Sequence, residues 1–251
     1  MNLQEINTID QVIDALNKIV AETKKENNPL GYFAALYKKV TIKVKEGITS
    51  NLFDDGERME KLDVIFAKRY IEAYYQYQSN EKTTKSWKVA FDLSTNYWPI
   101  VLQHLLAGMN AHINLDLGIA AAKISEGKDI HLLKNDFNKI NEVLSSLVNE
   151  VQNDLAQVWP KLKYLLKISG KADDFLVDFS MKLARNGAWK FAESLAEEPS
   201  DLKFLIDKRD QRIVEKASIV IKPGFIISTI FGIIRLGEKG SVADRINYLN
   251  N

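Results

Sequence analysis

The chain contains no cysteine, and only five prolines and twelve glycines occur among its 251 residues. The absence of cysteine excludes disulfides, a catalytic thiolate and zinc sites built on cysteine. It is also consistent with a reducing compartment, so we expect a cytoplasmic protein. Because proline and glycine are rare over long stretches, the sequence favours helices over a turn-rich β fold.

An excess of charge is missing as well. Lys and Arg number 34 against 33 Asp and Glu, for a formal net charge of +1. This balance argues against a basic surface for nucleic acid or for an acidic membrane, so we expect no nucleic-acid partner. The first residues, MNLQEINTIDQVIDAL, lack the basic and the uninterrupted apolar segments of a signal peptide.

The most unusual stretch is residues 99–122, which hold no Lys, Arg or Glu and in which Asp116 is the only charged residue. A run so poor in charge on every face is either a membrane span or a buried helix. Asp at the centre of a span costs roughly 2.5–3.5 kcal/mol, and the histidines, asparagines and glutamine of this stretch add to that cost. We therefore predict no membrane span and a buried central helix over about 97–126.

Apolar residues recur at helical spacing through most of the remaining chain. This periodicity predicts one all-α domain over residues 1–251, a bundle of roughly eight to ten helices around the central one. The other helices are expected over 9–20, 29–47, 57–78, 87–93, 129–157, 172–196 and 201–217, with a buried C-terminal helix over 225–236. Thr8 with Gln11 has the pattern of a capping box at the first helix.

The polar residues of the central helix fall into two groups at 100° per residue. One group is spaced by four: His104, Gly108, His112 and Asp116. The other group lies on a different side of the helix: Gln103, Asn110 and Asn114. Each group needs partners on a neighbouring helix, because an unpaired buried polar group costs about 1–3 kcal/mol. Gly108 leaves room for a ligand, an ion or a close helix contact.

His112 and Asp116 are the sharpest candidate pair, because side chains at i and i+4 can reach one point. Three roles are open. The pair could ligate one divalent metal ion with help from other helices. Asp116 could instead hold the imidazole in one tautomer, so that His112 acts as a general base. Both could simply satisfy each other in a buried polar network. His104 lies eight residues before His112, about 12 Å along the axis. This distance is near or beyond the reach over which two imidazoles can bind the same metal ion.

A second candidate element contains Arg185 and Trp189, which are also spaced by four and can stack. Arg185 could pair with Asp116 across the core, bind a ligand carboxylate or phosphate, or simply lie over Trp189 at the surface. His131, the third histidine of the chain, is expected at the surface near a helix start.

Familiar catalytic motifs are missing. The chain has no Glu-x-x-His pair of the ferritin-like di-iron type and no His-Glu-x-x-His. It also has no phosphate-binding P-loop, no Gly-x-Ser-x-Gly and no Gly-x-Gly-x-x-Gly. Any chemistry must therefore come from a less common arrangement.

The segment 104–117, HLLAGMNAHINLDL, resembles a family of bacterial proteins classed as a domain of unknown function. That family carries a Gly-Met-Asn-Ala-His-Ile-Asn-x-Asp-Leu signature and an Arg-x-x-Ala-Trp segment, which Arg185, Ala188 and Trp189 would match. The resemblance implies that Asn110, His112, Asn114 and Asp116 are signature positions, and it implies no activity. The His-x-x-x-Asp spacing is also similar to that of helical zinc-dependent phospholipases and nucleases, which need more His and Asp ligands than this chain offers.

Two hypotheses follow. The first is a small-molecule enzyme, hydrolase- or oxygenase-like, with a buried site on the central helix. His112 and Asp116 would be its catalytic or metal-binding pair. The expected ligand-binding residues are His104, Asn110, Asn114, Arg185 and Trp189. The alternative is a non-catalytic helical bundle that binds an apolar ligand or a protein, with the polar motif as a structural network.

Overall fold

The computed structural model describes residues 3–160 and 181–251, and all regular elements within these ranges are helical. The predicted all-α bundle is therefore confirmed. The first helices are α1 (Ile9–Lys25), α2 (Gly31–Thr49), α3 (Gly56–Gln78), α4 (Lys85–Asp92), α5 (Val101–Ala111) and α6 (Leu117–Ile124). They are followed by α7 (Lys134–Val158), α10 (Met181–Glu197), α11 (Leu202–Ile221), α12 (Phe225–Gly237) and α13 (Val242–Asn250). The predicted helix over 172–196 matches α10, although its residues 172–180 lie outside the described ranges.

Several helix starts follow from local sequence. The Thr8 hydroxyl accepts a hydrogen bond from the Gln11 amide, and the Gln11 side chain accepts one from the Thr8 amide, which confirms the capping box of α1. Asp55 caps α3 by accepting from the Arg58 amide at 2.9 Å. These side chains satisfy backbone donors that the first turn of a helix leaves unpaired.

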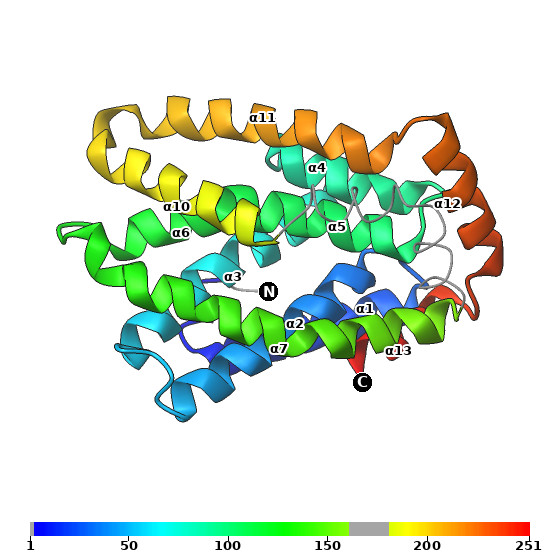
Figure 1. Cartoon of the computed structure of the whole chain (residues 1–251), viewed down its shortest axis with the longest axis horizontal. Helices are drawn as coiled ribbons and strands as arrows, with labels where there is room; N and C mark the ends of the chain where they lie inside the picture. The colour runs from blue at the N-terminus through cyan, green and yellow to red at the C-terminus, as the bar shows by residue number, and fades with distance from the viewer. Residues whose placement is uncertain (1–2, 161–180) are drawn as a thin grey trace.

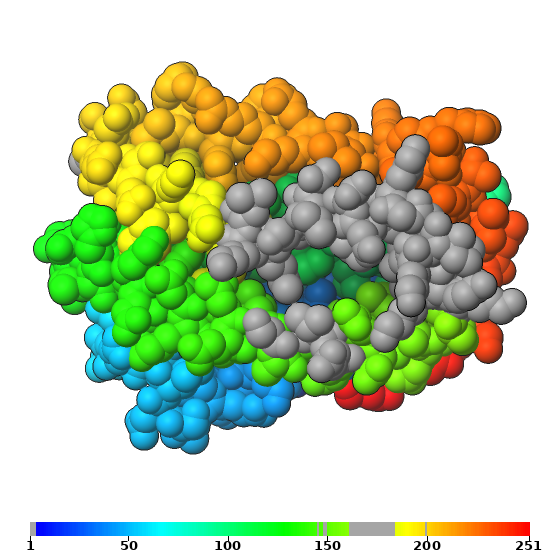
Figure 2. Space-filling view, viewed as in Figure 1, coloured from blue at the N-terminus to red at the C-terminus, as the bar shows by residue number. Residues whose placement is uncertain are grey.

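The predicted central helix is present as a rod of three segments: α5, the π-helical turn His112–Asp116, and α6. In the π turn the Leu117 amide donates to the His112 carbonyl, five residues earlier. The rod runs through the middle of the molecule, in contact with α2 and α3 on one side and α10 and α11 on the other (Figure 1). Atoms of the rod (dark green) and of α2 (blue) are visible between α7 and α11 in Figure 2.

Two glycines let other helices approach the rod closely. A Cβ on Gly108 would lie 2.5 Å from the ring of Phe33 on α2. A Cβ on Gly118 would lie 2.7 Å from the ring of Phe191 on α10 and 2.9 Å from the Ala188 carbonyl oxygen. Of the three uses open to Gly108, the structure shows the close helix contact.

The expectation of a buried C-terminal helix over 225–236 was wrong. Phe225 is 87% exposed and Leu236 73% exposed, while Phe231 and Ile234 are buried. The physical reason is the break at Pro223–Gly224, where α12 bends away from α11 by 67°. After this bend, α12 covers only the small apolar cluster around Ile100, Leu102 and Trp159.

Within the described residues, no single helix combines the length and the apolar character that crossing a membrane requires. The helices α11 and α12 meet these criteria only when taken together as a bent pair.

Candidate functional site

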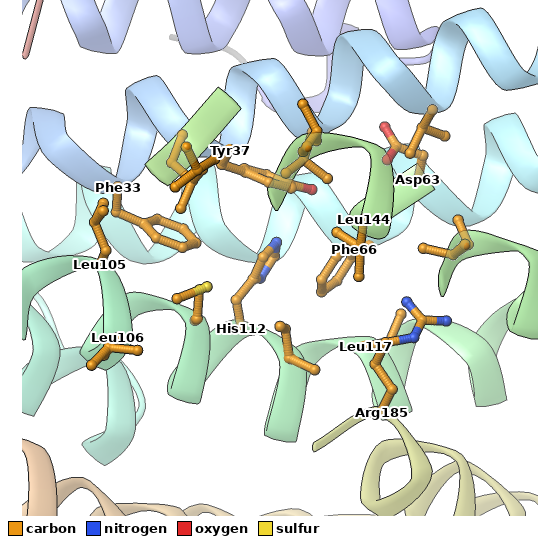
Figure 3. Close-up of a pocket in the computed structure, with 18 of the residues that line it drawn as sticks. Phe33, Tyr37, Asp63, Phe66, Leu105, Leu106, His112, Leu117, Leu144 and Arg185 are labelled. Atoms are coloured by element: carbon orange, nitrogen blue, oxygen red, sulfur yellow. The ribbon is translucent and has the colours of Figure 1, made fainter. Parts of the chain in front are cut away.

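A cavity of about 400 Å³ lies between the central rod and helices α2, α3 and α7, and its walls are almost entirely apolar (Figure 3). The rod presents one face to it, from Leu102 to Leu117. Five polar side chains line it among the described residues: Tyr37, Asp63, His112, Gln152 and Arg185. A concave, largely apolar cavity of this size with a few polar groups has the character of a small-molecule site.

His112 stands in the middle of this cavity. Its imidazole lies parallel to the Phe66 ring, with 3.6 Å between the ring centroids, and meets the Tyr37 ring edge-on at 4.5 Å. Figure 3 shows the imidazole rising from the rod between these two side chains. Its Nδ1 lies 3.1 Å from Oδ2 of Asp116, whereas its Nε2 is buried and has no hydrogen-bond partner.

Asp116 is fully buried, and three neighbours hold its carboxylate. Arg69 Nε donates to Oδ1 at 2.6 Å, and Trp87 Nε1 donates to Oδ2 at 2.8 Å, beside the contact with His112. Burial by itself raises the pKa of Asp116, but Arg69 and the donors from His112 and Trp87 outweigh it and leave the pKa below its usual value. Asp116 is therefore ionised at neutral pH.

An ionised carboxylate can only accept hydrogen bonds, so the proton of the His112–Asp116 contact lies on Nδ1 of the imidazole. Burial lowers the pKa of His112, against the opposing effect of Asp116, and the ring is neutral at pH 7. Nε2 is then an acceptor with a free lone pair. This is the arrangement that a carboxylate-oriented general base requires.

The π turn that carries the pair is fixed from outside. A π turn removes one backbone hydrogen bond of the regular helix, and here Arg209 Nε on α11 donates to the Asn114 carbonyl at 2.9 Å. Arg209 thus satisfies an acceptor within the turn. Such turns are frequent at functional sites, because they change the direction of side chains on either side of the inserted residue.

Unpaired polar atoms are concentrated at the cavity. Eight buried side-chain nitrogen and oxygen atoms lack a hydrogen-bond partner in the described part of the chain. Four of them belong to cavity-lining residues: the Tyr37 hydroxyl, Asp63 Oδ2, His112 Nε2 and Arg185 Nε. Since buried polar groups are normally hydrogen-bonded, this concentration indicates a binding site for a polar group.

Arg185 reaches the cavity from α10. One of its terminal nitrogens donates to the Phe137 carbonyl, and the guanidinium lies over the Phe137 ring at 4.7 Å. The suggested pairing with Asp116 is not observed, because Arg69 occupies that position. Stacking on Trp189 is not observed either, because the cation over that ring is Lys134, at 4.0 Å.

The other predicted ligand-binding residues lie away from the cavity. Trp189 is buried and donates to Glu193. Asn114 donates to Asn110, which donates to the Ile213 carbonyl of α11, each at 3.1 Å. His104 packs edge-on against Tyr32 at 5.4 Å, and burial lowers its pKa to about 3.

None of these four residues belongs to the described lining of the cavity. His131 is exposed, as predicted, with a side-chain exposure of 68%.

The metal role of His112 and Asp116 finds no support in the donor set. Nδ1 of His112 and Oδ2 of Asp116 already contact each other. Oδ2 also accepts from Trp87, and Oδ1 accepts from Arg69. No cluster of three or more His, Cys, Asp or Glu side chains suited to a metal ion occurs in the ranges that the structure describes.

Sequence reasoning missed Arg69, Trp87, Tyr37 and Asp63. Asp63 gave a usable signal, because a carboxylate interrupts the apolar stripe of α3 between Met59 and Phe66. The others gave none, since their partners lie far away along the chain.

The fold and the site together define a class: an all-α protein whose central helix carries a His–Asp pair on a π turn, at the wall of an apolar cavity. Residues 9–223 match the model of a family of unknown function, DUF5995, and the chain belongs to this family. A search of curated proteins and a search of solved structures found no match.

Proposed function

We propose that the protein binds a small, mostly apolar molecule in the cavity and that His112 accepts a hydrogen bond or a proton from it. The observation that carries this proposal is that Nε2 of His112, a residue of the cavity lining, is buried and unpaired while Asp116 holds Nδ1. A buried acceptor without a partner is unfavourable by about 1–3 kcal/mol. A ligand that donates to Nε2 would remove that penalty.

For an enzyme, this geometry favours proton transfer. The described lining contains no Ser, Thr, Cys or Lys side chain that His112 could activate as a nucleophile. His112 would instead deprotonate the ligand itself or a water molecule bound with it, which is chemistry of the hydrolase type. An oxygenase-like reaction would need a redox group such as a metal centre. The described lining offers one imidazole and one carboxylate, which suit proton transfer better than they suit metal binding.

The alternative is a non-catalytic carrier. In this case the His112–Asp116 pair is a fixed acceptor that orients a ligand and does not change it. The nearly continuous apolar wall favours this function as much as it favours an enzyme. The two are separated by whether a bound molecule is recovered unchanged.

Binding is tested with the neutral fluorescent probe Nile red. We expect the wild type to bind the probe and Leu144→Trp, which places a large ring in the cavity, to lose most of that binding. Leu132→Trp is the matched control, because Leu132 is 63% exposed. Equal binding by all three proteins would place the probe elsewhere and contradict a ligand in this cavity.

The role of His112 is tested by nitrogen NMR of the imidazole. We expect a neutral ring protonated on Nδ1 at pH 7, and a change in the Nε2 resonance when a ligand that can donate a hydrogen bond fills the cavity. In Asp116→Asn the preference for this tautomer should disappear.

Catalysis is tested with the molecules released from the natively purified protein. Incubating them with the wild type and with His112→Gln shows whether the wild type alone converts them.

A further inference from the structure

The cavity has one polar end. Its wall along the rod runs from Leu102 to Leu117, about 22 Å at 1.5 Å per residue. In Figure 3, Leu105 and Leu106 lie toward one end, His112 lies in the middle, and Asp63 and Arg185 lie on the side of Leu117. The shape is therefore long, with apolar side chains at one end and a cation and a carboxyl group toward the other.

Arg185 is the unusual group at this polar end. It is 3% exposed, its Nε has no hydrogen-bond partner, and no carboxylate pairs with it among the residues that the structure describes. Other strongly buried cations do have such partners; Lys39, for example, contacts Asp154 at 2.6 Å. Buried charges are normally paired, because an isolated one loses its hydration without compensation.

We propose that the ligand of the cavity is an amphiphile with a carboxylate head group and a long alkyl chain. Its carboxylate would pair with the guanidinium of Arg185, and its chain would extend past His112 toward Leu105 and Leu106. This inference rests on the proposed binding function and adds the chemical class of the ligand.

The head group is a carboxylate on grounds of charge and shape. One terminal nitrogen of the guanidinium donates to the Phe137 carbonyl, and Nε remains as a donor for a planar anion. Asp63 lines the same end, so a doubly charged phosphate would meet a second acidic group there. Burial raises the pKa of Asp63 to about 7, and in its protonated form it can donate a hydrogen bond to the bound carboxylate.

The chain passes His112 at some distance from the head group. Leu117 comes five positions after His112, about 7 Å along the rod. A hydroxyl group part-way along the chain would meet Nε2, so hydroxylated acids should bind more tightly than plain ones.

The test compares dodecanoate with dodecan-1-ol, each displacing Nile red from the full chain at pH 6, where Asp63 is protonated, and below micellar concentration. We expect the wild type to bind dodecanoate about tenfold more tightly than the alcohol, the ratio that one charge-assisted pair supplies. Arg185→Gln should lose that preference and keep its affinity for the alcohol, while Arg185→Lys keeps part of it. Gln157→Leu, at an exposed position of α7 outside the cavity lining, should leave the ratio unchanged.

The outcomes separate the two proposals. If the wild type binds neither Nile red nor either amphiphile, the proposed function itself fails. If it binds both amphiphiles equally, or if Arg185→Gln keeps the preference for dodecanoate, only the carboxylate inference is overturned. Should Arg185→Gln not fold, the ratio measured on the wild type and on Arg185→Lys decides, because a wild-type ratio near one is sufficient to reject the inference.

Discussion

A single buried carboxylate, that of Asp116, determines what His112 can do. Arg69 and Trp87 keep Asp116 ionised, and the ionised group fixes the proton of His112 on Nδ1. Nε2 is thereby left without a hydrogen-bond partner. Asp63 is the opposite case, a carboxyl group in the same cavity without any ion-pair partner among the described residues, and its pKa is raised.

Asp63→Asn should stabilise the protein at alkaline pH. A carboxyl whose pKa is raised from 3.8 to about 7 by burial destabilises the folded state as it ionises, so stability is lost while the pH rises through this window. We expect the variant to exceed the wild type in unfolding free energy by roughly 2–4 kcal/mol at pH 8 and by little near pH 4.

Urea unfolding followed by circular dichroism at both pH values measures this difference. Asp207→Asn, on the exposed face of α11, should change nothing at either pH. A stability gain in Asp63→Asn that does not depend on pH would show that ionisation is not its cause. An acid such as Asp63, which destabilises the folded protein, is expected to persist in a cavity where function requires it.

At the scale of elements, the central rod is held at a short distance from α2. The contact depends on Gly108, because any side chain there would overlap Phe33. The same rod presents Gln103 and Asn110 to α11, where they donate to the Val220 and Ile213 carbonyls. These contacts fix the rotation of the rod, and with it the direction in which His112 points.

Gly108→Ala should therefore destabilise the protein, by roughly 1–3 kcal/mol, because the added methyl group lies 2.5 Å from the Phe33 ring. Gly232→Ala in α12 is the matched control, since nothing lies within 4 Å of its Cβ position. There the higher helix propensity of alanine should stabilise by about 0.5–1 kcal/mol. Thermal unfolding of both variants measures the two effects, and a loss of equal size in both would refute the close contact.

The helix α12 offers a second matched pair, at neighbouring residues. Ile234 is 1% exposed and Ile233 is 54% exposed. Ile234→Glu places a charge in the cluster around Trp159 and should cost about 3 kcal/mol or more. Ile233→Glu should change the unfolding free energy by no more than about 0.5 kcal/mol. Denaturant midpoints give both values, and a large loss in Ile233→Glu would mean that the outer face of α12 is covered in solution.

At the scale of the whole molecule, the bundle encloses two histidines of the central rod. His104 lies beside Tyr32, and His112 lies beside Phe66. Burial lowers the pKa of both, so both are neutral when the protein is folded. The unfolded chain exposes them, and there they bind protons at mildly acidic pH.

The unfolding free energy should thus fall as the pH decreases from 6.5 to about 3, the window between the ordinary pKa of a histidine and the pKa of His104. His104→Gln should fall less steeply over this window, while His131→Gln, at an exposed position, should follow the wild type. Asp63 has the opposite effect, because its protonation stabilises the folded state as the pH falls. This effect is common to all three proteins, so it cancels when each variant is compared with the wild type. Identical slopes in all three proteins would contradict a buried, neutral His104.

Much of the fold and part of the site could be predicted from the sequence. Apolar spacing within one helical turn predicted the helices, and the low charge of residues 99–122 predicted the central one. The bond between His112 and Asp116 followed from their i, i+4 spacing. Such features depend on neighbours at most a few residues away, and local helix geometry specifies them.

Only the tertiary structure decided the environment of that pair. Arg69 and Trp87 lie 47 and 29 residues from Asp116, and no periodicity links residues at such separations. The same holds for the hydrogen bond from Arg209 of α11 to the π turn, and for the cavity, whose walls come from separate helices. The exposure of α12 likewise depended on a bend at Pro223–Gly224. Helix periodicity states which residues share a face, but the packing of distant segments determines what that face meets.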